Sequence, residues 1–368
     1  MTITDVAREA RVSVASVSRV VNGHSNVTPE TRRRILEVVD RLRYVPDTAA
    51  RSLITRRTHM IGVLLPDVYG DFFSELIRGI DGAAREHGLH LLLSSSHGDA
   101  TEMADAIRAM RGRVEGLLVL APQLDTSGLG EIDAAVPTVF INSRVDGGAS
   151  PRLSIDSYGG ARAMVKHLIA LGHRTIAHIT GPVDNYDSHE RERGYRDELA
   201  AALPKARPIV VRGDFSEASG YAAGRELAAA TSRPAAVFAA NDVMAIGGLA
   251  AFAELGLVAP RDIAIAGFDD IPLAAYVRPA LTTMRVPIVD LGRNAFAQLV
   301  AAIAAPGATR AATTWLRPEL VVRESCGAIG AHAQPTRSPV TDGGHDAQPR
   351  SRRSRGKQVP ASGKRSRR

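Results

Sequence analysis

Several polar and aromatic residues follow short apolar runs in the middle of the chain, where they could bind a small molecule. Arginine, asparagine and aspartate offer hydrogen-bond donors and acceptors to hydroxyl groups, and aromatic faces can stack on the C–H surfaces of a sugar. This combination suits a polyol ligand. The candidate binding residues are Asp71, Phe73, Asn142, Arg191, Phe215, Asn241 and Asp269.

Some of these residues could have a structural role instead, and the ligand could be of another class. Asn241 and Asp242 could simply cap the helix that follows them, and for Asp242 and Asp270 we expect a structural role. A purine is the alternative ligand. It would call for several aromatic residues in the cleft, but the whole chain holds only 8 Phe and 1 Trp, so a sugar is favoured.

The sequence lacks the residue patterns that carry covalent or metal chemistry. It has no phosphate-binding loop, no GxGxxG after a strand, and no HExxH, CxxC or GxSxG motif. The single cysteine, Cys326, excludes a disulfide framework and a cysteine-cluster metal site. We therefore expect neither an enzyme nor a bound cofactor or metal.

A second group of candidates lies near the N-terminus, on the outer face of a short helix expected at 14–22. Ser13 can cap this helix, and Val17, Val20 and Val21 form its buried stripe. Helices are also expected at 4–10 and, after Thr28-Pro29, at 29–42. A compact three-helix unit of this kind can present the start of its second helix to the major groove of DNA.

The side chains on that face have the chemistry to read DNA. Arg19 could donate two hydrogen bonds to a guanine, and Val14 and Ala15 could touch a thymine methyl group. An isolated Arg19 could be just a solvated arginine, but residues 1–57 hold 11 Lys+Arg against 6 Asp+Glu. The residues expected to contact phosphate or otherwise complete the interface are Thr4, Ser16, Ser18, Asn22, Thr28 and Tyr44.

From residue 60 onward, apolar runs alternate with helical stretches, which predicts parallel sheets covered by helices on both faces. In such sheets ligands bind beyond the carboxyl ends of the strands, where the first group of candidates stands. The chain is expected to cross between two lobes near 145–151. The expected strands are 60–65, 89–93, 116–121, 137–141, 175–180, 208–211, 235–240 and 263–268, and the helices 72–87, 100–112, 158–171, 190–202, 216–230 and 241–255.

The 368 residues carry a net charge of +7 that is unevenly spread. Residues 331–368 hold 10 Lys+Arg against 2 Asp+Glu, while 58–330 hold 25 against 31. The tail, rich in Pro, Ser, Gly and Arg, is expected to be disordered, either as an electrostatic arm for DNA or as a neutral extension. With no membrane-spanning run and no export signal, the protein is expected to be cytoplasmic.

The stretch ITDVAREARVSVASVSRVVNG, followed by VTPETRRRILEVVDRLRYVPDTAARSL, resembles the N-terminus of the lactose/galactose-repressor (LacI/GalR) family. The resemblance covers about 1–326. It implies a small all-α helix-turn-helix head, an α/β two-lobed core like the type I periplasmic binding proteins, and a disordered basic tail. Arg11 departs from the family, which usually has glycine in a left-handed conformation at this turn.

The resemblance also implies domain boundaries. The head spans 1–45, the hinge 46–58, the effector-binding and dimerisation domain 59–326, and the tail 327–368. The N-lobe is expected at about 59–156 and 287–312, and the C-lobe at about 157–286 and 313–326. In the family the hinge folds over the minor groove, and Ala50 and Leu53 match its contact residues.

For function, the resemblance implies a ligand-responsive repressor. A homodimer would bind a pseudo-palindromic site in double-stranded operator DNA and release it when a sugar-type inducer binds. Arg191, Asn241 and Asp269 match the family's hydroxyl-binding residues, and Gly70-Asp71 replaces its usual Asn-Pro. The alternative is a corepressor-dependent regulator of the same fold with a purine or a phosphorylated partner as effector.

Overall fold

The computed structural model describes residues 1–23, 25–45, 57–122, 136–143, 150–305 and 313–327. Most of the predicted hinge, including Ala50 and Leu53, and the predicted tail beyond Gly327 lie outside the described residues. No helix among the described residues is long and apolar enough to cross a membrane.

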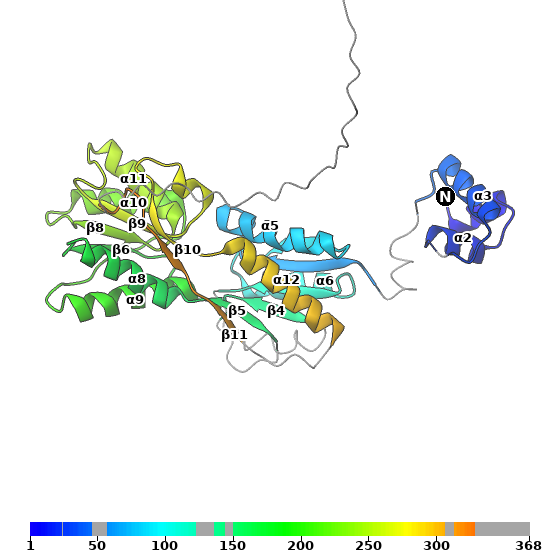
Figure 1. The fold of residues 1–368 in the computed structure, drawn as a ribbon, viewed down its shortest axis with the longest axis horizontal. Helices are drawn as coiled ribbons and strands as arrows, with labels where there is room; N and C mark the ends of the chain where they lie inside the picture. The colour runs from blue at the N-terminus through cyan, green and yellow to red at the C-terminus, as the bar shows by residue number, and fades with distance from the viewer. Residues whose placement is uncertain (24, 46–56, 123–135, 144–149, 306–312, 328–368) are drawn as a thin grey trace, which may run out of the picture. The chain divides into compact units, whose positions relative to one another are not determined.

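The N-terminal segment forms three short helices around a small apolar core (Figure 1). They are α1 (Ile3–Glu9), α2 (Val14–Val21) and α3 (Pro29–Leu42), which confirms the three predicted helices. Val17 and Ile35 are fully buried where the helices meet. Ala7 is also buried, and its small side chain lets α1 and α2 approach closely.

Each of these helices begins at a hydroxyl residue whose side chain accepts a hydrogen bond from the first turn. Thr2 caps α1, Ser13 caps α2, and Thr28 caps α3 directly before Pro29. A cap of this kind satisfies a backbone N–H that has no partner inside the helix and contributes about 1 kcal/mol. The caps predicted at Ser13 and Thr28 are therefore confirmed.

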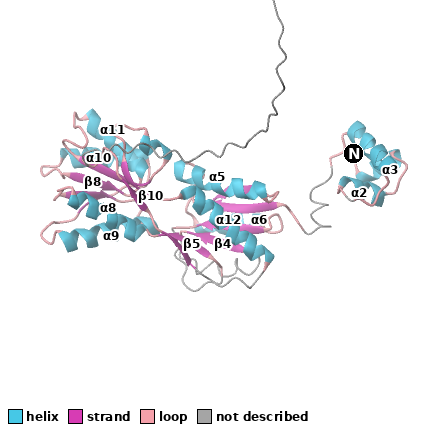
Figure 2. Ribbon diagram, in the orientation of Figure 1, coloured by secondary structure: helices cyan, strands magenta, loops and turns pink. Residues whose placement is uncertain are grey.

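The rest of the described chain forms two six-stranded sheets, each flanked by helices (Figure 2). The N-lobe sheet has the order β11-β5-β4-β3-β1-β2 and is parallel throughout. The C-lobe sheet has the order β12-β10-β9-β8-β6-β7 and is parallel except for β12. The N-lobe strands are β1 (Met60–Leu65), β2 (His90–Ser95), β3 (Gly116–Leu120), β4 (Thr138–Ile141), β5 (Arg152–Ile155) and β11 (Thr313–Leu316). The C-lobe strands are β6 (Ile176–Ile179), β7 (Ile209–Val211), β8 (Ala236–Ala239), β9 (Ala264–Asp269), β10 (Thr282–Arg285) and β12 (Glu319–Val321).

Pairs of helices cover the faces of the sheets. In Figure 1, α5 lies beside α12 on the N-lobe, and α8 lies beside α9 on the C-lobe. Because both faces are covered, β1, β3, β4, β8 and β9 are buried along almost their whole length, as their unbroken apolar runs predicted. The helices are α5 (Asp71–Glu86), α6 (Ala100–Met110), α8 (Ser157–Ala170), α9 (Tyr186–Ala202), α10 (Glu217–Ala229), α11 (Asp242–Glu254) and α12 (Ile288–Ala304), with a 3₁₀ turn at η2 (Pro272–Ala275).

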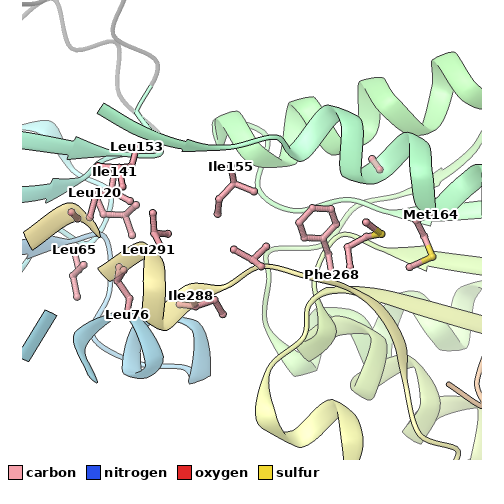
Figure 3. Packing of buried hydrophobic residues seen from close by; sticks show 14 of the residues in the cluster. Leu65, Leu76, Leu120, Ile141, Leu153, Ile155, Met164, Phe268, Ile288 and Leu291 are labelled. Atoms are coloured by element: carbon pink, nitrogen blue, oxygen red, sulfur yellow. The ribbon is translucent and has the colours of Figure 1, made fainter. Parts of the chain in front are cut away.

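One hydrophobic cluster continues from the N-lobe into the C-lobe (Figure 3). Leu76 and Leu291 contribute from the N-lobe helices, and Phe268 contributes from the C-lobe sheet. Ile155 is the last residue of β5, and Ile288 is the first residue of α12. Both lie between the N-lobe residues Leu76 and Leu291 and the C-lobe residue Phe268. The residues next to the crossings are thus packed into the hydrophobic core that the two lobes share.

The structure corrects two of the predictions about the lobes. The chain crosses after Ile155, which agrees with the N-lobe boundary expected near 156 but not with the crossing expected at 145–151, because the unpredicted strand β5 still pairs with β4. Residues 313–316 belong to the N-lobe rather than the C-lobe, because β11 pairs with β5, and only β12 joins the C-lobe sheet. Both strands are short and partly polar, and β11 is an exposed edge strand, so neither shows the apolar pattern of a buried strand.

Candidate functional site

A cavity of about 640 Å³ lies between the N-lobe and the C-lobe, and we call it the cleft. Its wall comes from the loops after β1, β2, β3 and β4 on one side and after β6, β7 and β8 and the end of β9 on the other. It therefore lies at the carboxyl ends of both sheets, as expected for parallel α/β folds. The structure brings together all seven predicted residues in the cleft wall, namely Asp71, Phe73, Asn142, Arg191, Phe215, Asn241 and Asp269.

Arg191 is held rigidly in the cleft wall. Its side chain is 4% exposed, and its guanidinium group donates hydrogen bonds to Ser157 Oγ (3.3 Å), the Ala240 carbonyl and Asp269 Oδ1 (3.3 Å). The group also stacks on Phe268, with 3.8 Å between the guanidinium carbon and the ring centre. A ligand would therefore meet an arginine that is already oriented.

Asp269, the partner of Arg191, is itself buried in the cleft wall. Burial raises the pKa of the Asp269 carboxyl to about 7, against the opposing effect of Arg191. Near neutral pH the carboxyl group therefore exists in both protonation states. It can accept a hydrogen bond from a ligand hydroxyl or, when protonated, donate one.

Three cleft residues have left-handed backbone conformations that residues other than glycine rarely adopt. The φ angles are 46° at Asn142, 72° at Phe215 and 108° at Asp269. Such conformations cost about 1–3 kcal/mol each and persist where the surrounding structure enforces them, commonly at ligand sites. Three of the eight non-glycine residues with positive φ in the described part of the chain are thus predicted ligand contacts.

Two asparagines of the cleft also have structural partners. Asn142 Oδ1 accepts a hydrogen bond from the Ile155 N–H (2.9 Å), at the crossing between the lobes. Asn241 Oδ1 accepts from the Met244 N–H (2.9 Å) and caps α11, while its amide donates to the Phe215 carbonyl (3.0 Å). Asn241 thus caps α11, as the alternative prediction had it, and also forms part of the cleft wall.

In the N-terminal unit, the exposed face of α2 carries the side chains that the sequence assigned to DNA. Val14 is 42% exposed, and Ala15, Arg19 and Asn22 are exposed, whereas Val17 and Val20 are buried. Ser16 and Ser18 are half-buried. The face thus combines an arginine with small apolar and hydroxyl groups. This is the chemistry that reads and positions DNA in the major groove.

The remaining predicted DNA contacts differ in their surroundings. Thr4 is exposed on α1, and Thr28 is exposed while it caps α3. Tyr44 is half-buried and packs against the apolar core of the three-helix unit. Tyr44 therefore has a packing role whatever it contacts on DNA.

Comparison with known proteins agrees with this arrangement. Residues 2–47 match the family described as bacterial regulatory proteins, lacI family, and residues 165–326 match a periplasmic binding protein-like domain. Over 296 residues the chain is 35% identical to catabolite control protein A of Priestia megaterium, covering 79% of this chain and 89% of that protein. The chain belongs to the LacI family.

Two further relatives support the assignment of this LacI-family chain. It is 36% identical to the ribose operon repressor of Escherichia coli strain K12 over 309 residues, which cover 83% of this chain and 94% of the repressor. The crystal structure of the lac repressor dimer bound to operator and the anti-inducer ONPF matches with a TM-score of 0.78 at 29% identity, covering 89% and 99% of the two chains. The predicted fold class and the prediction of a DNA-binding transcriptional regulator are confirmed.

The LacI-family turn between α1 and α2 keeps its shape although it lacks the usual glycine. Arg11 has a φ of 53°, in the left-handed region. The cost to a side chain with a Cβ is about 1 kcal/mol, and the surrounding turn sustains it. The conformation predicted from the resemblance is therefore confirmed.

Sequence reasoning missed part of the cleft wall. Asn185 and Asp187 come from the loop after β6 and the start of α9, and both are buried. Asp187 accepts a hydrogen bond from Ser157 Oγ (2.8 Å), and burial raises the pKa of its carboxyl group. The carboxyl end of the strand expected at 175–180 was the signal that could have pointed to them. Tyr69, His97 and Asp214 also line the cleft.

Two aspartates next to the cleft residues have structural roles, as expected. Asp242 is completely buried and accepts hydrogen bonds from the Ile271 N–H (2.9 Å) and the Thr283 hydroxyl. Asp270 accepts from Arg285 (2.7 Å) and Arg323 (2.6 Å). These bonds tie together the strands and loops behind the cleft, so neither carboxylate is free to take a ligand.

Proposed function

We propose that this protein is a homodimeric, cytoplasmic repressor that binds a pseudo-palindromic site in double-stranded operator DNA. A sugar-type inducer binds in the cleft and releases the DNA. The protein is not an enzyme, and it associates with the nucleoid when it is bound to DNA. The observation that carries the proposal is the pair of Arg191 and Asp269, preoriented in the wall of a cleft between two lobes.

The cleft chemistry favours a hydroxyl-rich ligand. Arg191 donates and Asp269 accepts or donates, so adjacent hydroxyl groups of a sugar can pair with both. Phe73 and Phe215 line the same cavity and offer apolar surface to the C–H groups of the ring. Asp71 begins α5 in the N-lobe, so a ligand that reaches both Asp71 and Asp269 bridges the two lobes.

A bridging ligand can be coupled to DNA binding because the segments that join the lobes are packed into the core. Ile155 and Ile288 lie within one hydrophobic cluster shared by both lobes. Since packed cores do not deform continuously, a ligand that favours one lobe arrangement shifts the population between discrete states. Most of the hinge that would transmit the shift, including Ala50 and Leu53, lies outside the described residues.

The proposal is tested in two steps with the full chain. Selection from a random DNA library first yields the preferred site, which we expect to be pseudo-palindromic. Mono- and oligosaccharides are then screened by thermal shift, because a ligand that binds the folded state raises its melting temperature. A hit should weaken DNA binding in fluorescence anisotropy. A hit that strengthens it would make the protein corepressor-dependent, and selection that yields no preferred DNA sequence would overturn the proposal.

A further inference from the structure

A second cavity, of about 380 Å³, lies outside the cleft, and we call it the back pocket. It is located where two segments that cross between the lobes run side by side. The N–H of Asp156, just after β5, donates a hydrogen bond to the carbonyl of Leu316, the last residue of β11 (2.8 Å). Side chains of both crossing segments and of α9 line the pocket.

Three of the nine residues that line the back pocket are aromatic. Tyr158, Tyr186 and Trp315 all contribute to its wall. Trp315 is the single tryptophan of the chain, yet it is 55% exposed on an edge strand rather than buried in a core. Aromatic side chains stabilise a fold by being buried, so this exposed ring offers stacking surface for a flat ligand.

The back pocket is lined by two arginines, Arg193 and Arg317, and by two carboxylates, Asp156 and Glu190. Asp156 accepts a hydrogen bond from the Gly159 N–H (2.8 Å) at the start of α8. Arg193 stacks on Tyr158, with 4.3 Å to the ring centre, and bonds to Glu190 (2.6 Å), so its charge is already compensated. Arg317 is exposed, and within the described part of the chain no carboxylate lies within ion-pair distance of it. A guanidinium group of this kind can hold a phosphate through paired hydrogen bonds.

The back pocket shares structural elements with the cleft. Ser157 lines the back pocket, while its hydroxyl group donates to Asp187 and accepts from Arg191, two residues of the cleft wall. The first turns of α9 lie between the two cavities, with Asp187 and Arg191 lining the cleft and Tyr186 and Arg193 lining the back pocket. A ligand in either cavity therefore acts on the same short segment.

We propose that the back pocket is a second, allosteric site that binds a nucleoside monophosphate, with the base stacked on Trp315 and the phosphate held by Arg317. Binding there changes the affinity of the cleft for its effector through Ser157 and the start of α9. The coupling rests on the proposed effector role of the cleft, whereas nucleotide binding itself does not. Coupling free energies between sites correspond to changes of about fivefold or more in affinity.

Binding is tested with the full chain and adenosine monophosphate (AMP), using Trp315 as the only tryptophan reporter. We expect saturable quenching of its fluorescence by AMP, and weaker binding of adenosine and of inorganic phosphate. In calorimetry, Arg317→Gln should weaken AMP binding by about tenfold, the typical effect of losing one charged hydrogen bond. Arg261→Gln, an exposed arginine on the C-lobe paired with Asp262, is the matched control and should bind AMP normally.

Further measurements separate the possible outcomes. AMP binding that is lost in Asp269→Asn but kept in Arg317→Gln would place the nucleotide in the cleft and overturn the proposal, as would the absence of saturable binding. If AMP binds through Arg317 but leaves the affinity of a cleft ligand unchanged, the allosteric part fails. If AMP binds and no saccharide does, the proposed effector class fails while the back pocket stands.

Discussion

Arg191 Nη2 lies 3.3 Å from Asp269 Oδ1, although 78 positions separate the two residues in the chain. Both side chains are almost completely buried, and together they form a fixed donor and acceptor in the wall of the cleft. Asp269 is held there with a positive backbone φ of 108°, so the pair joins a strained backbone position to a buried ionisable group.

Replacing Asp269 by alanine should abolish the response to the effector while DNA binding persists. The substitution removes the acceptor for a ligand hydroxyl but leaves the N-terminal three-helix unit unchanged. Operator binding measured by fluorescence anisotropy, with and without the saccharide found in the screen, checks this expectation. If Asp269→Ala protein still releases the operator at the wild-type saccharide concentration, the assignment of the cleft is wrong.

The ionisation of Asp269 predicts a pH dependence of stability. Folded Asp269 keeps its proton up to a pKa of about 7, whereas in the unfolded chain its pKa lies near 3.8. Between these values the folded state binds more protons, so the contribution of Asp269 to the free energy of unfolding falls as the pH rises. Asp269→Asn, which stays neutral, should therefore gain stability relative to wild type between about pH 4 and pH 7, measured by urea denaturation.

Asp262→Asn is a control for Asp269→Asn, because the pKa of Asp262 is lowered in the folded protein whereas that of Asp269 is raised. Hydrogen bonds from Arg261 and from the Val258 N–H lower the pKa of Asp262 to about 2. Its stabilising contribution is present above the pKa of the unfolded chain and is lost as the pH falls towards 2. Relative to wild type, the Asn variant should thus lose stability as the pH rises from 2 to 5. If the stability difference from wild type varied with pH in the same way for Asp269→Asn and Asp262→Asn, the directions assigned to the two pKa shifts would be wrong.

Arg19→Ala should reduce discrimination between DNA sequences rather than binding in general. Loss of a bidentate contact to guanine costs about 1–3 kcal/mol at the cognate site and little elsewhere. The measurement compares affinities for the selected site and for a scrambled site at fixed salt. Arg33→Ala, another exposed arginine of the three-helix unit, paired with Glu37, is the control. Equal weakening on both DNAs would mean that Arg19 contributes only charge.

Arg11→Gly should stabilise the N-terminal three-helix unit by up to about 1 kcal/mol. Glycine relieves the cost of the left-handed conformation at φ 53°, although part of the gain is offset by the greater freedom of the unfolded chain. Hydrogen exchange of the backbone amides in residues 1–45, measured in the full chain, reports the change in stability of the three-helix unit. Arg8→Gly lies within α1, where glycine should instead destabilise by about 1 kcal/mol. A loss of stability in both variants would show that Arg11 has a favourable contact that outweighs its strain.

The charges of the cleft predict which ligands it rejects. Six carboxyl groups line it, against the single arginine Arg191 among its described lining residues. Burial raises the pKa of Asp187 and Asp269, which weakens their negative charge, but the set as a whole still repels an anionic group on the ligand. The phosphorylated form of any saccharide that binds should have a higher dissociation constant than its parent in calorimetry. Asp71→Asn should narrow that difference, because Asp71 is exposed at the start of α5. A phosphorylated sugar that binds more tightly than its parent would refute this charge argument. The acidic residues are Asp67, Asp71, Asp187, Asp214, Glu217 and Asp269.

The sequence alone determined the local elements of this protein and the residue types of its cleft. Buried strands such as β1 show unbroken apolar runs, and α2 and α3 begin at cap residues, because burial and capping depend on neighbours in the chain. The rule that ligands bind at the carboxyl ends of parallel strands, together with the resemblance to the LacI/GalR family, then selected seven residues, all of which line the cleft.

Only the tertiary structure decided what depends on residues far apart in the chain. The short strand β11 pairs with β5, which itself pairs with β4, and the partly polar sequences of β5 and β11 carry no sign of these pairings. Ser157 donates a hydrogen bond to Asp187 and accepts one from Arg191, and these bonds join segments that the sequence does not place together. The raised pKa of Asp269 likewise arises from burial between such segments. Spacing along the chain predicts which face of an element is apolar, but it cannot predict which distant element will cover that face.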